Sequence, residues 1–270
     1  MAWYMRSSPF RILTVALALG LAVNVPLQVQ AQLRPASLSS QLPLQWEPPR
    51  TPGSSAPVNR ESGGVRGPCL TTSQKLVALV PASGMGTTTA DYPTVFWYMP
   101  ESQASAVEFM LQDSNNRQVY SVKYNLAKSA EGVVRAPGIM SLTLPALANL
   151  SPLKSGQTYK WSVTLICTTE LTDNSGNPFV EGTIERVDLA PSLAWRIEQA
   201  TPKERVALYA QQGAWYETLK TLVELQRDFP RDREVTQALD KLLQSVELDP
   251  MPQSSERENI SQLNSVPLER

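Results

Sequence analysis

Histidine is absent from all 270 residues of the sequence. Its absence excludes Ser–His and Cys–His nucleophilic systems and removes a ligand of the common zinc sites. The side chain best suited to proton transfer near neutral pH is therefore missing as well. We expect a protein that is not an enzyme and holds neither a metal nor a cofactor. An enzyme that relies on carboxylates alone is a minor alternative.

Basic residues are too few and too dispersed for a nucleic-acid partner. Lys and Arg number 24 against 25 Asp and Glu, and no basic run is longer than two residues. Phosphate binding requires a basic surface. We therefore expect the partner to be a protein or a cell-envelope polymer.

The N-terminal segment has the three parts of a secretory signal peptide. Arg6 and Arg11 precede an apolar run at 12–25, and Val29 and Ala31 place small residues before a cleavage site. This pattern predicts a signal peptide over residues 1–31. A retained membrane anchor is the alternative, but the run is shorter than the roughly 20 residues that a span needs. No second apolar run follows, so we expect a periplasmic or secreted protein without a stable membrane span.

The sequence has only two cysteines, Cys69 and Cys167. In an oxidising compartment such a pair predicts a disulfide, and two buried free thiols are the alternative. The bridge would close a loop of about 100 residues, for which the chain-entropy model gives roughly 4–5 kcal/mol of stabilisation.

Two regions have the composition of unfolded chain. Residues 32–68 contain seven prolines, four glycines and six serines. Such a segment buries too little apolar surface to offset the entropy of ordering it. We expect a disordered linker over 32–68 and a disordered tail over 249–270.

The region 69–190 has the alternation of β-strands. The clearest strand covers 157–167, where apolar residues at Tyr159, Trp161, Val163 and Leu165 alternate with more polar ones. Before it lies a hairpin with arms near 107–111 and 120–126 and a turn at 113–116, where asparagine tolerates positive φ. Further strands are expected at 75–80, 94–99, 139–144 and 179–187.

About seven short strands separated by turns predict an immunoglobulin- or fibronectin-like antiparallel β-sandwich over 69–190. Leu153, Gly156 and Tyr159 lead into the 157–167 strand and resemble the tyrosine corner of such domains.

From residue 191 the apolar period becomes helical. Thr201, Pro202 and Glu204 form a helix start with a capping box. Apolar and small residues from Tyr209 to Pro230 follow the tetratricopeptide spacing, which predicts one helical hairpin, and a further helix starts at Asp232. One such unit cannot bury its own apolar face, so we expect the segment 191–248 to pack on the sandwich.

The 94–99 strand is apolar on both faces, so both faces should be covered. We expect Trp97 to enter the sandwich core, and Phe96 and Tyr98 to meet the helical segment.

Several segments resemble a cyanobacterial family of exported proteins, the domain of unknown function nine-two-eight. They are GGVRGPC at 63–69, ALVP at 78–81, PTVFWYMP at 93–100, FVEGTIER at 179–186, ATPKER at 200–205, LYA at 208–210 and GAWY at 213–216. Thr218 stands where the family more often has alanine. The resemblance implies an exported cyanobacterial protein and brings no catalytic residue and no ligand.

Four short motifs could carry chemistry, and each has a simpler structural interpretation. Ser151 and Lys154 have Ser-x-x-Lys spacing, but a glycine turn and a strand follow at once. Glu181 and Glu185 are too far apart along a strand for a retaining glycosidase. The 173–177 segment lacks the remaining ligands of a calcium loop, and the glycine-rich 63–67 segment lacks the strand and helix of a phosphate cradle.

The aromatic residues Trp97, Tyr98, Trp161, Trp195 and Trp215 are expected mainly in the core. Trp97, Tyr98, Trp195 and Trp215 are also the candidate binding residues. If exposed in a planar row, they would indicate a carbohydrate-binding module. The favoured hypothesis is a non-enzymatic binding or assembly module, because a sandwich followed by a helical repeat is an architecture of recognition.

Overall fold

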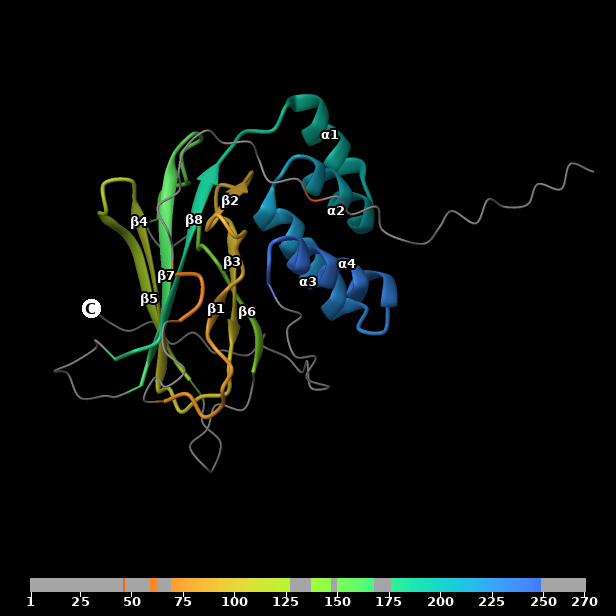
Figure 1. Cartoon of the computed structure of the whole chain (residues 1–270). Helices are drawn as coiled ribbons and strands as arrows, with labels where there is room; N and C mark the ends of the chain where they lie inside the picture. Colours follow the sequence, from red (N-terminus) through yellow and green to blue (C-terminus); the bar gives the residue numbers. More distant parts are fainter. Residues whose placement is uncertain are drawn as a thin grey trace, which may run out of the picture. The chain divides into compact units, whose positions relative to one another are not determined.

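The computed structural model describes residues 46, 59–62, 69–126, 137–146, 150–167 and 176–248. Within these residues eight strands are followed by four helices (Figure 1). The expected signal peptide, most of the expected linker and the expected C-terminal tail lie outside the described residues. No helix of the described residues combines the length and the apolar composition that a bilayer span requires.

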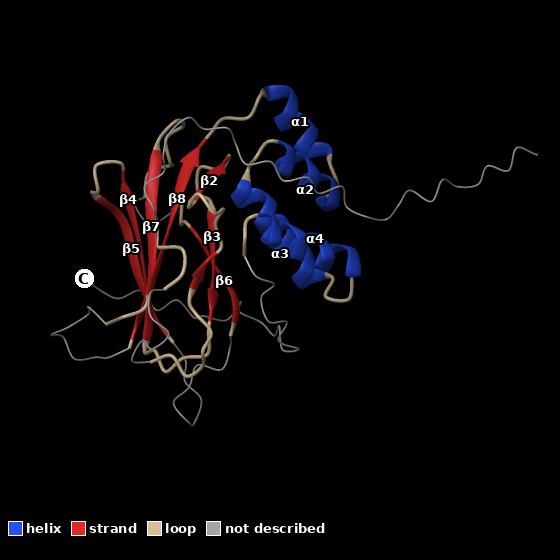
Figure 2. Ribbon diagram, viewed as in Figure 1, coloured by secondary structure: helices blue, strands red, loops and turns tan. Residues whose placement is uncertain are grey.

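The strands form two sheets that enclose an apolar core (Figure 2). The larger sheet has the order β2 (Met85–Thr88), β8 (Phe179–Arg186), β7 (Thr158–Ile166), β4 (Ala106–Asp113) and β5 (Gln118–Asn125). The smaller sheet has the order β1 (Val77–Ala78), β3 (Thr94–Met99) and β6 (Gly138–Thr143). The predicted β-sandwich is thereby confirmed.

The sandwich departs from the prediction in one strand. β2 was not expected from the sequence, and it pairs with β8 in parallel, whereas the other strand pairs are antiparallel. The sheets are therefore mostly rather than wholly antiparallel.

Alternation along β7 produces the core as expected. Trp161, Val163 and Leu165 are fully buried, and the ring of Trp161 stacks on Phe109 of β4. At the start of the strand the Tyr159 hydroxyl accepts a hydrogen bond from the Lys154 N–H at 3.1 Å. Gly156 supplies the positive φ of +70° that the preceding turn needs. The tyrosine-corner prediction is confirmed.

The helical segment consists of α1 (Pro191–Gln199), α2 (Pro202–Gln211), α3 (Trp215–Asp228) and α4 (Arg233–Ser245). Its four helices exceed the hairpin and single further helix that were predicted, and α1 is the addition. The capping box of Thr201 and Glu204 is present at the start of α2. Gly213, with a φ of 68°, makes the turn between α2 and α3.

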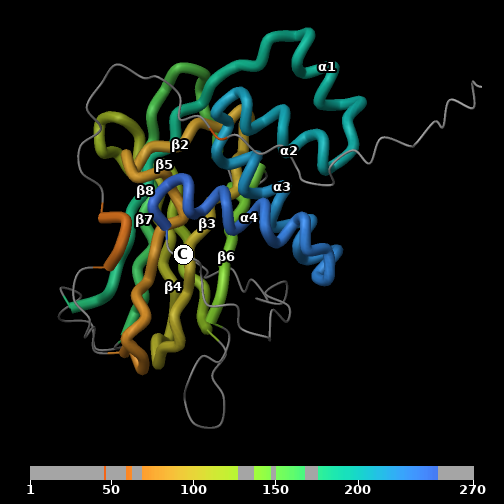
Figure 3. Tube along the Cα trace, turned by 45° about the vertical axis from the view of Figure 1, so that its right-hand side comes forward, coloured from red at the N-terminus to blue at the C-terminus, as the bar shows by residue number. Residues whose placement is uncertain are grey.

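Helix α3 lies against β2 and β3 (Figure 3). In the pairing of β3 with β6, Trp97 lies opposite the buried Met140, and Phe96 lies opposite the exposed Ser141. Trp97 therefore belongs to the core face of the smaller sheet. Phe96 belongs to the outer face and is nevertheless buried, as expected for a residue beneath a helix.

Residues 59–62 make contact with both sheets and with the last helix. The Ala78 N–H donates to the Arg60 carbonyl, and the Glu181 N–H donates to the Asn59 carbonyl, each at 2.8 Å. The Arg60 guanidinium donates to the carbonyls of Val246 and Glu247 at the end of α4, at 2.8 and 2.6 Å. These four residues thus belong to the folded part of the chain, although their composition suggested a linker.

Candidate functional site

The four candidate binding residues do not share a surface. Trp97 and Tyr98 are each 4% exposed and Trp215 is 0% exposed, whereas Trp195 is 64% exposed. The expectation of a core position is confirmed for the buried residues, and also for Trp161, but it is wrong for Trp195. A planar row of exposed aromatics at these positions is not formed, because three of the four rings fill the interior.

Trp195 lies on the open face of α1. Ile197 is the buried residue of this helix, and Trp195 and Arg196 point away from it and are exposed. Arg205 of α2 fixes the end of α1, since its Nε donates to the carbonyls of Ile197 and Ala200 at 3.0 Å. Trp195 and Arg196 are therefore exposed to solvent on a helix whose C-terminal end is fixed by Arg205.

A second exposed aromatic follows α3. Phe229 is 56% exposed. Asp232 and Glu234 follow Phe229 closely in the sequence and lie at the start of α4. Both form ion pairs with Lys203 of α2, at 2.8 and 2.6 Å. Hydrogen bonding from Lys203 lowers the pKa of Asp232. Among the described residues, Trp195 and Phe229 are the most exposed large apolar side chains, and both belong to the helical segment. Sequence analysis did not single out Phe229 as a surface residue.

Trp215 and Tyr216 anchor the helical segment to the sandwich. The Trp215 Nε1–H donates to the Leu79 carbonyl at 2.9 Å. The Tyr216 hydroxyl accepts from Trp161 Nε1 at 2.9 Å and donates to the Thr183 carbonyl at 3.0 Å. Tyr216 therefore joins α3 to the core of the larger sheet.

Gly86 in β2 makes room for these two rings. A Cβ at this position would lie 2.8 Å from Cε2 of Tyr216 and 2.9 Å from Cδ1 of Trp215. Real Cβ atoms do not approach other atoms so closely, so only glycine fits here without a rearrangement. The close approach of α3 to β2 depends on this residue.

Glu217 is a buried carboxyl in the same interface. Its Oε1 accepts a hydrogen bond from the Thr88 hydroxyl at 2.5 Å. Burial raises the pKa of Glu217 above its ordinary value of 4.5. The hydroxyl of neighbouring Thr87 donates to the Gly213 carbonyl at 2.6 Å, so two successive residues of β2 hold the start of α3. Because the carboxyl is covered, we assign it to helix docking rather than to catalysis.

The titration of Glu217 should make folding pH-dependent. Below pH 4.5 the carboxyl is protonated in both states, and its contribution to stability is fully present. Above pH 4.5 the unfolded chain loses this proton first, so stability should fall as pH rises through the raised pKa of the folded state. Glu217→Gln cannot titrate and keeps an oxygen for Thr88. Its urea unfolding free energy should therefore fall less than that of the wild type between pH 4.5 and 7.

Glu224→Gln is the matched control, because Glu224 is an exposed carboxylate on the same helix. It should keep the wild-type pH dependence. An identical slope for the wild type and Glu217→Gln would contradict the assignment.

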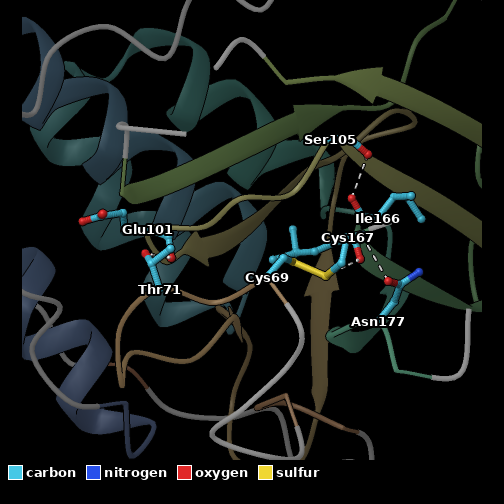
Figure 4. The surroundings of a disulfide bond; sticks show 8 residues. Cys69, Thr71, Glu101, Ser105, Ile166, Cys167 and Asn177 are labelled. Carbon is cyan, nitrogen blue, oxygen red and sulfur yellow. Dashed lines mark hydrogen bonds between the residues drawn. A yellow bond between two sulfur atoms is a disulfide. The ribbon is translucent and has the colours of Figure 1, made fainter. Parts of the chain in front are cut away.

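The predicted disulfide joins Cys69 to Cys167 (Figure 4). Hydrogen bonds hold both ends. The Gln103 N–H donates to the Cys69 carbonyl at 2.7 Å, and the Cys167 N–H donates to Oδ1 of Asn177 at 3.1 Å. The bridge thus ties the segment before β1 to the end of β7.

The short motifs have structural roles where they are described. Ser151 and Lys154 lie in an exposed connection outside any helix, as expected. Glu181 forms an ion pair with Lys160 at 2.6 Å. In the 173–177 segment only the last two residues are described, and Asn177 supports the disulfide through Cys167. The glycine-rich 63–67 segment lies outside the described residues. No group of three potential metal ligands occurs in the part of the chain that the structure describes.

Comparison with known proteins gives a family and no activity. The family model "Domain of Unknown Function (DUF928)" matches residues 61–256. A search of the curated proteins finds no significant match. Among solved structures, the fn3 domain of human collagen alpha-1(XX) chain matches with 18% sequence identity and a TM-score of 0.26, over 52% of this chain and 94% of that chain.

The DUF928 match spans both sheets and all four helices of the described structure, from just before β1 to beyond α4. One family match therefore covers both the sandwich and the helical segment, and the chain belongs to the DUF928 family.

Proposed function

We propose that the chain is a non-enzymatic module outside the cytoplasm that binds a protein partner through the open face of α1. The observation that carries this proposal is the 64% exposure of Trp195 on a helix held by Arg205. Tryptophan is highly buried on average, and Trp and Arg dominate the binding energy of protein interfaces. The neighbouring Arg196 is also exposed and adds the second of these residue types to α1.

A location outside the cytoplasm rests on two features of the chain. The N-terminal sequence has the pattern of a secretory signal, and Cys69 and Cys167 form a disulfide. Disulfides persist mainly in oxidising compartments. Both features favour a periplasmic or secreted protein of the cell envelope.

A binding role rather than catalysis is favoured by the residue inventory and by the use of the carboxylates. Histidine is absent from the whole sequence. The buried Glu217 is engaged with Thr88 in the helix–sheet interface, and Glu181 is paired with Lys160. A general acid must reach the substrate, and neither carboxylate is free to do so.

A protein partner is favoured over a carbohydrate by the burial of the other candidate aromatics. Trp97, Tyr98 and Trp215 hold the sandwich and the helices together and are closed to a sugar ring. Of the four candidate residues, only Trp195 offers an exposed ring on which a sugar could stack. An envelope polysaccharide is the alternative partner, and the experiment below distinguishes it from a protein.

Site-specific photo-crosslinking at position 195 tests the proposal in the cells that make the protein. A benzophenone side chain at Trp195 should give discrete adducts that protease removes. The matched control carries the same group at Phe179, which is 43% exposed and lies on β8. It should give no such adducts.

A Trp195→Ala variant should bind the partner with an affinity at least about tenfold lower than that of the wild type. This is the loss expected for an interface residue that contributes more than about 1.4 kcal/mol to the binding free energy. Adducts sensitive only to glycosidase, or equal adducts from positions 195 and 179, would contradict the proposal.

A further inference from the structure

The two sides of the sandwich differ in how their strand edges are covered. On one side, the Arg60 carbonyl binds the Ala78 N–H of β1, and the Asn59 carbonyl binds the Glu181 N–H of β8. On the other side, β5 is the last strand of the larger sheet, and no described segment binds its outer edge. Among the described residues, the sandwich is therefore closed by backbone hydrogen bonds on one side and open along β5.

Alternate residues of β5 direct their backbone groups towards this open side. The Leu126 N–H, just after β5, donates to the Ser105 carbonyl, just before β4, at 2.9 Å. Backbone groups alternate in direction along an antiparallel strand, and the register is unbroken here, so the even-numbered residues of β5 bond to β4. The N–H and C=O groups of Ser121, Lys123 and Asn125 therefore point outwards, and within the described part of the chain they have no backbone partner. All three residues are exposed.

The side chains of β5 that face the core are incompletely covered. They lie opposite core residues of β4, and the three pairs are Tyr120 with Leu111, Val122 with Phe109, and Tyr124 with Val107. The β4 members are at most 2% exposed, whereas the β5 members are half-buried. The apolar row thus continues to the edge of the sheet and ends there without a neighbour. A strand added to this edge would satisfy the free backbone groups and cover the row.

β5 has little of the protection that free sheet edges usually carry. Proteins protect such edges with short strands, proline, charges and bulges. β5 has eight residues, no proline and one charge, Lys123, and Glu108 of β4 lies directly opposite this lysine. The irregularity in register lies at the hairpin end, between Leu111 and Gln112. The rest of the edge is regular and suited to pairing.

We propose that the outer edge of β5 pairs with the β5 edge of a second copy of this chain, antiparallel and about a two-fold axis at Val122. The two larger sheets then form one continuous sheet through an isologous contact. In this register Tyr120 lies opposite Tyr124 of the second copy, and Lys123 lies opposite Ser121 of the second copy. The surface is separate from α1 and does not depend on the function proposed for that helix.

The sequence of β5 favours this register over its neighbours. A shift of one residue would pair outward backbone groups with groups already bonded to β4. A shift of two residues in one direction would place the two copies of Lys123 opposite each other, and like charges in opposite positions are destabilising. A shift of two residues in the other direction would lose both Tyr120–Tyr124 pairs, which are of the aromatic type that stabilises a sheet. The strand is thus self-complementary about Val122.

Charge substitutions at Ser121 test the pairing through effects of opposite sign. Ser121 is exposed and lies opposite Lys123 of the second copy in the proposed dimer. Ser121→Glu should lower the Kd of dimerisation and Ser121→Lys should raise it, each by at least about threefold, because the dimer contains the pair twice. Sedimentation velocity of the full chain over a range of concentrations measures the Kd.

The matched controls are Ser141→Glu and Ser141→Lys, because Ser141 is an exposed serine on β6, at the edge of the smaller sheet. Both should leave the Kd unchanged. A wild type that stays monomeric at millimolar concentration would overturn the proposal. So would Ser121 variants that keep the wild-type Kd or change it in the same direction.

A cross-link at the two-fold axis tests the register. Val122 lies opposite itself in a pair without hydrogen bonds, in which Cα atoms are about 4.5 Å apart, within the range that a disulfide spans. Val122→Cys should therefore give a covalent dimer on mild oxidation, seen on a non-reducing gel. Asn125→Cys is the control on the same strand, because its two copies lie far apart along the pair, and it should stay monomeric on the gel. Equal cross-linking of the two variants, or none of Val122→Cys, would contradict the proposed pairing.

Discussion

Trp215→Ala is expected to lower the free energy of unfolding by about 3–5 kcal/mol, in the range measured when large buried aromatics are truncated. The ring is fully buried between β2, Leu79 and Trp46, and its Nε1 satisfies the Leu79 carbonyl. Truncation leaves a cavity and an unpaired carbonyl where α3 meets the sheet. Urea unfolding followed by circular dichroism measures the loss.

The matched control for this experiment is Trp195→Ala, because it removes the same side chain from an exposed position on a helix. It should change the unfolding free energy by no more than about 0.5 kcal/mol. A loss below about 1 kcal/mol for Trp215→Ala would contradict its role as the anchor of the helical segment.

The double variant Cys69→Ser/Cys167→Ser is expected to lose roughly 4–5 kcal/mol of stability according to the chain-entropy model. The bridge joins residues separated by 98 positions, so its removal enlarges the unfolded ensemble considerably. Replacing both cysteines avoids a leftover thiol that could form mixed disulfides. Thermal unfolding of the variant and of the oxidised wild type measures the difference.

The reduced wild type should behave like the double variant, while a reducing agent should leave the double variant unchanged. In protein isolated from its own cells without reductant, both thiols should resist alkylation. Two freely alkylated thiols would contradict both the bridge and the proposed location outside the cytoplasm.

Local patterns predicted the elements whose structure depends on local chemistry. The alternation in β7 and the capping box of Thr201 and Glu204 both occur where the sequence predicted them. Each of these signals comes from residues a few positions apart, because side-chain period and backbone capping are local properties.

The elements that were missed depend on distant parts of the chain. β2 has the sequence MGTT, which has no apolar alternation, and it is a strand because it pairs with β8 and lies under α3. Residues 59–62 are polar and join the fold through backbone hydrogen bonds, which composition does not reveal. Neither interaction can be inferred before the topology is known.

The tryptophans of the candidate site show the same difference between local sequence patterns and tertiary packing. Trp195 and Trp215 are both helical tryptophans, and the sequence treated them alike. Their exposures of 64% and 0% follow from tertiary packing, because α1 packs on α2, whereas α3 also packs on β2 and β3 of the two sheets. The exposed tryptophan and the buried anchor could be told apart only with the fold in hand.

The hydrogen bonds from Arg60 to the end of α4 have a consequence for folding during biosynthesis. Its acceptors are the carbonyls of residues 246 and 247, which leave the ribosome long after Arg60 itself. Contacts of such sequence separation form late and slow the folding reaction. The Arg60 side chain therefore lacks these two acceptors until residues 246 and 247 have been synthesised. A truncation that removes residues 246 and 247 would leave the Arg60 guanidinium without these two acceptors, although the backbone bonds of residues 59 and 60 to the sheets would remain.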